Sequence, residues 1–157
     1  MKQQVFNPYL PSWEYIPDGE PHVFGDRVYV YGSHDSFGAR NKLGIRCLYA
    51  PDVTQGPDGR YYLYYAFDFM GEMGVAVCDT PAGRYEFYGH VHFKDGHVWG
   101  KSGEPFPFDP GILVDDDKRV YLCWGGGGVD GTGMITICRT SISYKRKKGC
   151  FSGSCFF

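Results

Sequence analysis

Short apolar stretches, each preceded by a group of turn-forming residues, recur along the chain. The clearest turn groups are Gly25-Asp26, Pro57-Asp58-Gly59 and Asp115-Asp116-Asp117. The apolar stretches that follow them are Arg27–Gly32, Arg60–Ala66 and Arg119–Gly125. Turn residues that tolerate unusual dihedrals, followed by β-branched and aromatic residues, predict a strand after a tight turn.

Three more strands are expected from the same pattern. His22–Phe24 precedes the first turn, and Gly74–Cys78 and Tyr85–Val91 flank a hairpin signal at Thr80–Gly83. No stretch has the 3.6-residue period of a long amphipathic helix. The pattern therefore predicts an all-β protein.

Composition agrees with this fold class. The 157 residues suit about one domain, and a hydrophobic content of 43% can supply a core. The 23 Gly, 12 Phe, 13 Tyr and 3 Trp favour short strands with tight turns, because glycine is costly inside helices and aromatic residues fit a pleated surface. A net charge of -2 gives no electrostatic reason to expect nucleic acid or an anionic membrane as partner. A neutral ligand is favoured.

Three segments share a carboxylate that begins a β-like stretch before a polar turn. These carboxylates are Asp18, Asp52 and Asp109. A repeat of this kind indicates a β-propeller, in which equivalent positions of successive blades converge on one pocket. We expect the three acids to face each other there. Like charges held together are explained more readily by chemistry than by packing.

Targeting and cysteine patterns point to a cytoplasmic protein. No apolar run reaches signal-peptide length or the roughly 20 residues of a membrane span, so no membrane partner is expected. Six cysteines occur without a Cys-x-x-Cys pair or zinc-like spacing, which favours buried free thiols.

Three motifs, in order, resemble those of glycoside hydrolase family 43. They are Asp18 with Gly25–Tyr29 and Tyr31–Ser33, Ala50–Val53 with Gly59–Leu63, and Phe108–Pro110 with Asp115–Asp117. The resemblance covers residues 7 to about 137. It implies a five-bladed β-propeller, of which about two to three blades are present. It also implies inverting hydrolysis of saccharides that contain arabinose or xylose, as in α-L-arabinofuranosidases and β-xylosidases.

The resemblance also implies roles for the acids. The family takes its general base from the first blade, and a second aspartate, here Asp109, orients the general acid and modulates its pKa. Asp18 is the expected base, because it stands eight residues before Asp26 as Asp109 stands eight before Asp117. Glu20 is the competing residue, since it occupies the place before a proline. Without the resemblance, Asp109 could equally be a strand-start cap.

Three further residues are candidates for substrate binding. Asp52 could accept hydrogen bonds from sugar hydroxyls or hold Asp18 in position, and a purely structural role in its turn is equally open. Trp13 and Tyr15 could supply an aromatic face for a sugar ring or belong to the core. His22, His34 and Asp35 lie near the first motif, and no partner is evident for them, so structural roles are favoured.

The general acid expected from the family has no counterpart here. No glutamate follows Asp109, since the five are Glu14, Glu20, Glu72, Glu86 and Glu104. We expect residues 1–138 to form the propeller part and residues 139–157, which read like a frame break or premature stop, to form a non-homologous disordered tail. The chain is then a fragment whose exposed blade flanks favour self-association. The alternative function is a non-catalytic carbohydrate-binding or assembly module.

No cofactor is predicted. The resemblance allows a calcium ion at the propeller axis, as in some relatives, but no motif supports a metal site. Asp115–Asp117 lacks the spaced ligands of an EF-hand, and Gly125–Gly128 is not a phosphate loop because no Gly-Lys-Ser/Thr follows. These glycines favour close backbone approach near the channel. Lys145–Lys148 is too small a basic cluster to predict nucleic-acid binding.

Overall fold

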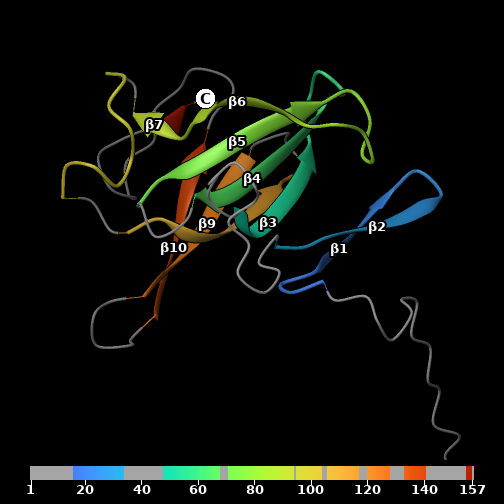
Figure 1. Cartoon of the computed structure of the whole chain (residues 1–157). Helices are drawn as coiled ribbons and strands as arrows, with labels where there is room; N and C mark the ends of the chain where they lie inside the picture. The colour runs from blue at the N-terminus through green and yellow to red at the C-terminus, as the bar shows by residue number, and fades with distance from the viewer. Residues whose placement is uncertain are drawn as a thin grey trace, which may run out of the picture.

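The computed structural model consists of short strands that form small antiparallel sheets (Figure 1). It describes residues 16–33, 48–67, 71–93, 95–103, 106–116, 120–127, 133–140 and 155–156. All helices and strands assigned within these ranges are β-strands, with no helix among them, so the all-β prediction is confirmed. The described residues contain no helix with the length and apolar character needed to cross a bilayer.

Three of the four sheets described are built from strands that follow one another in sequence. One hairpin pairs β1 (Glu20–Phe24) with β2 (Arg27–Tyr31). A four-stranded sheet contains, in order, β3 (Leu48–Gln55), β4 (Tyr61–Phe67), β5 (Met73–Cys78) and β6 (Glu86–His90). A three-stranded sheet contains β8 (Phe108–Val114), β9 (Val120–Gly127) and β10 (Gly133–Thr140). The remaining pair is β7 (His92–Phe93) with β11 (Cys155–Phe156).

The β1–β2 and β3–β4 strand pairs are joined by the turns that the sequence predicts. Gly25 and Gly59 have φ of 64° and 83°, a region that glycine adopts without steric cost. Both stand in turns that join paired strands, β1 to β2 and β3 to β4. Local turn chemistry therefore fixed these strand boundaries.

The core lies between the two larger sheets. Strands β3 and β4 contact β8, and the β8–β10 sheet lies behind the β3–β6 sheet in Figure 1. The central cluster is Tyr62, Tyr64, Met73, Val75, Val91, Trp99, Leu122 and Trp124. The rings of Trp99 and Trp124 meet edge to face with centroids 4.4 Å apart, a favoured aromatic geometry.

The β1–β2 hairpin is attached to the β3–β6 sheet by aromatic side chains. Phe24 meets Tyr61 edge to face at 4.9 Å, and the Tyr31 hydroxyl donates to the carbonyl of Pro81 at 2.7 Å. On the hairpin, the cross-strand partners Val23 and Val28 are 71% and 66% exposed. Self-association through exposed blade flanks stays a prediction.

Strand β10 ends at Thr140, and most of residues 139–157 lie outside the described residues. The division of the chain at residue 138 stays a prediction. Cys78 and Cys123 are free thiols, as expected, but they are half-buried rather than buried.

Candidate active site

A repeated backbone distortion marks the candidate site. Among the described residues other than glycine, Asp18, Ala50 and Asp109 have positive φ, at 55°, 43° and 46°. This conformation costs roughly 1–2 kcal/mol for a residue with a Cβ and tends to cluster at functional sites. Ala50 and Asp109 each precede a proline, and each lies where the strand register shifts, between β3 and β4 and between β8 and β9. Ala50 and Asp109 therefore occupy one structural position repeated in two sheets, and Asp18, in the turn before β1, shares their positive φ.

The expected equivalence of Asp52 is wrong, because Ala50 occupies that position. The spacing contained the signal: Asp18 and Asp109 stand eight residues before Asp26 and Asp117, and the residue eight before Asp58 is Ala50. Asp52 shares a carboxylate with Asp18 and Asp109 but not their spacing from the turn. The distorted backbone, rather than the residue type, defines the repeat.

The negative charge of Asp18 acts on the carboxyl group of Asp109. Partial burial, and then the negative charge of Asp18, raise the pKa of Asp109 above its ordinary value, although its side chain stays accessible to solvent. A charge effect of this kind requires proximity. The acting charge is that of Asp18, not that of the competing Glu20, which is exposed at the start of β1.

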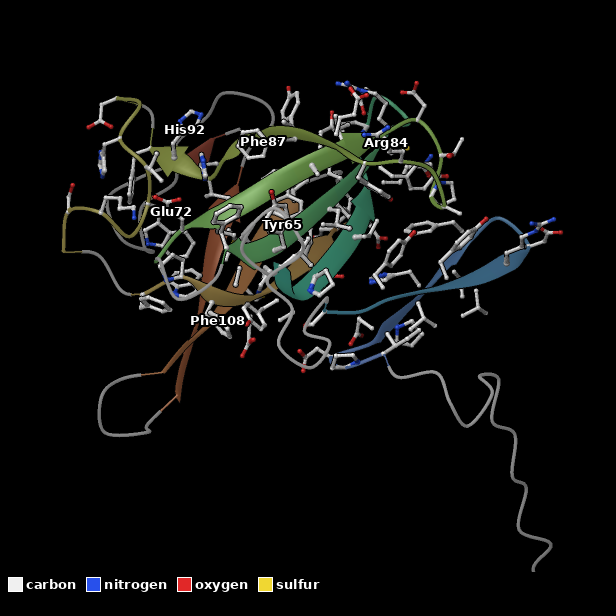
Figure 2. All side chains as sticks on the ribbon, viewed as in Figure 1. Tyr65, Glu72, Arg84, Phe87, His92 and Phe108 are labelled. Carbon is white, nitrogen blue, oxygen red and sulfur yellow. The ribbon has the colours of Figure 1, made fainter. Side chains whose placement is uncertain are left out.

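Asp109 lies directly against the backbone of β9. A Cβ added to Gly125 would stand 3.2 Å from both Cβ and Oδ2 of Asp109. Glycine at this position gives the carboxylate room. The place of Gly125–Gly128 near the channel stays a prediction. Figure 2 labels Phe108, the residue before Asp109, at this end of β8.

Asp52 is buried and joins three strands. Its Oδ1 accepts the N–H of Val53 at 2.8 Å, and its Oδ2 accepts the N–H of Ile112 in β8. Nε2 of His22, in β1, lies 2.7 Å from Oδ1. That nitrogen is not aligned for a hydrogen bond, so the contact is electrostatic and is strongest when His22 is protonated. These contacts favour the structural role among those left open for Asp52.

Ser33 was missed as a site residue. Its hydroxyl donates to Oδ2 of Asp18 at 2.6 Å, and only 8% of the residue is exposed. It belongs to the Tyr31–Ser33 motif, yet its partner lies 15 residues away in sequence, and no local pattern shows such a contact.

Several candidates lie outside the described residues. These are Trp13, Tyr15, His34 and Asp35. Within the described part of the chain, no group of three or more His, Cys, Asp or Glu is arranged to hold a metal ion.

Comparison with known proteins decides the family. The model of Glycosyl hydrolases family 43 matches residues 25–152. The chain belongs to glycosyl hydrolase family 43. A xylosidase/arabinosidase of Thermoclostridium stercorarium is 48% identical over 160 residues, which cover 80% of this chain and 34% of that protein.

Solved family 43 structures show the same fold. A glycoside hydrolase of family 43 from Bacillus licheniformis aligns with a TM-score of 0.60 at 20% identity, over 90% of this chain and 41% of that chain. An α-L-arabinofuranosidase from Clostridium thermocellum aligns with a TM-score of 0.57 at 24% identity, over 83% of this chain and 53% of that chain. The chain thus spans about a third to a half of these relatives. Its fold is part of the five-bladed family 43 propeller, as predicted.

Proposed function

We propose that this chain carries the general-base side of an inverting glycosidase site for saccharides that contain arabinose or xylose. The observation that carries the proposal is that the negative charge of Asp18 raises the pKa of Asp109, and that both residues have a positive φ. Asp18 is the base, and Asp109 orients the general acid and supplies the charge that modulates it.

The chemistry needs a fixed carboxylate. In inversion, two carboxyl groups about 6.5–9.5 Å apart flank the glycosidic bond, and the base takes a proton from the water that attacks the anomeric carbon. Asp18 is exposed to solvent, which admits this water. Protonation of the leaving oxygen falls to a general acid that we assign to no residue of this chain, since no glutamate follows Asp109.

The substrate class rests on relatives. The similar proteins include a xylosidase/arabinosidase and arabinoxylan arabinofuranohydrolases. Their names support arabinose- or xylose-containing substrates here.

The test is hydrolysis of 4-nitrophenyl α-L-arabinofuranoside and β-D-xylopyranoside, followed by proton NMR. A nitrophenolate leaving group needs little protonation, so the base alone can support turnover. We expect the first sugar released to have the inverted anomeric configuration. Retention of configuration would contradict the mechanism. Binding without turnover would favour a non-catalytic carbohydrate-binding or assembly module.

A further inference from the structure

Ser33 forms hydrogen bonds with two of the three described non-glycine residues that have positive φ, Asp18 and Ala50. Its Oγ accepts the N–H of Ala50 at 2.7 Å and donates to Oδ2 of Asp18 at 2.6 Å. Its own N–H donates to the carbonyl of Pro17, the residue before Asp18, at 2.9 Å. Ser33 therefore holds both the backbone and the side chain of the Asp18 segment.

The direction of these hydrogen bonds is fixed. A serine hydroxyl has one proton, and because its oxygen accepts the Ala50 N–H, that proton points to Asp18. Ala50 has a positive φ, as Asp18 and Asp109 do, but no acidic side chain, and its backbone N–H donates to Ser33 instead. This hydrogen bond explains why a strained backbone is kept at a residue without a functional side chain, where strain otherwise only costs stability.

The segment around Ser33 is packed closely enough to keep this arrangement. A Cβ on the neighbouring Gly32 would lie 2.0 Å from Cγ2 of Ile16 and 2.9 Å from the carbonyl oxygen of Pro17. The chain before Asp18 thus lies directly on the backbone that carries Ser33.

We propose that Ser33 is the positioning residue of the base: it anchors Oδ2 of Asp18, so that Oδ1 is the oxygen turned to the attacking water. The proposal rests on the function proposed for Asp18. In this proposal Ser33 touches neither the substrate nor the attacking water. It sets the rotamer of Asp18, which contacts that water.

The kinetic test compares Ser33→Ala with Ser33→Thr on the nitrophenyl glycosides. We expect Ser33→Ala to lower kcat by about 10- to 100-fold, the effect of a misplaced reacting group, with KM unchanged. Ser33→Thr, which keeps the hydroxyl, should restore kcat. Ser102→Ala, the same change at an exposed serine, should match the wild type.

A second readout does not depend on turnover. NMR couplings about χ1 of Asp18 should show one rotamer in the wild type and Ser33→Thr, and averaging in Ser33→Ala. One rotamer in all three proteins would overturn the role of Ser33, as would wild-type kinetics of Ser33→Ala beside an inactive Asp18→Asn. If Asp18→Asn retains full activity, the proposed function fails, and the couplings alone then decide whether Ser33 positions Asp18.

Discussion

Replacing Asp18 with asparagine is expected to lower kcat/KM on nitrophenyl arabinofuranoside or xyloside by about 10³-fold, within the roughly 10²–10⁴-fold range of general-base catalysis. This corresponds to about 4 kcal/mol of transition-state stabilisation. Asparagine keeps the size of the side chain, can accept the Ser33 hydrogen bond and tolerates the positive φ of 55°. It cannot take a proton from water, so the loss reports the base itself.

Two matched variants separate Asp18 from its neighbours. Glu20→Gln tests the competing residue, and Asp26→Asn removes a carboxylate whose side chain is 97% exposed. Both should keep wild-type kcat/KM. Loss of activity in Glu20→Gln, with activity retained in Asp18→Asn, would assign the base to Glu20 instead.

Asp52→Ala is expected to lower the free energy of unfolding by about 3 kcal/mol. The change leaves the N–H groups of Val53 and Ile112 without their acceptor and His22 without its charged neighbour. Removing one partner of a buried polar group costs about 1–3 kcal/mol for each group left unsatisfied. The residue is 6% exposed, so water cannot replace the lost contacts without rearrangement.

Urea unfolding followed by tryptophan fluorescence measures this effect, since Trp99 and Trp124 lie in the core cluster. Asp26→Ala, at the exposed tip of the β1–β2 hairpin, should leave the midpoint unchanged. An Asp52→Ala midpoint equal to that of the wild type would show that Asp52 does not hold β1, β3 and β8 together. It would reopen a direct role in substrate binding.

The strands were predictable because their signals are local. Turn residues such as Gly25 and Gly59 carry a steric reason for their positions, and the aromatic runs behind them fit a pleated sheet. The choice of Asp18 and Asp109 followed from equal spacing to a turn. The same spacing from Asp58 points to Ala50. A search for carboxylates overlooks this position, because alanine has none.

The contacts that organise the site were not predictable in this way. Asp52 accepts a hydrogen bond from a residue 60 positions away, and Ser33 donates to one 15 positions away. Such pairs depend on how separate sheets are placed, which no window of sequence contains. The cytoplasmic location, the disordered tail and the roles of Trp13 and Tyr15 stay predictions.

Asp109 also couples the site to stability. A carboxyl whose pKa is higher in the folded state than its ordinary value of 3.8 contributes stability that is complete below that value and is lost as pH rises through the folded pKa. Ionised Asp109 therefore destabilises the folded state at neutral pH. Removing the charge of Asp18 should reduce this loss.

Titration of the Asp109 carboxyl by carbon-13 NMR, in the wild type and in Asp18→Asn, tests most directly whether the two aspartates share one site. We expect the pKa of Asp109 to lie above 3.8 in the wild type and to fall in Asp18→Asn, because one of the two causes of its rise is the charge of Asp18. Asp26→Asn should leave it unchanged. A wild-type pKa at or below 3.8, or the same pKa with and without the Asp18 charge, would show that the two carboxylates do not face each other.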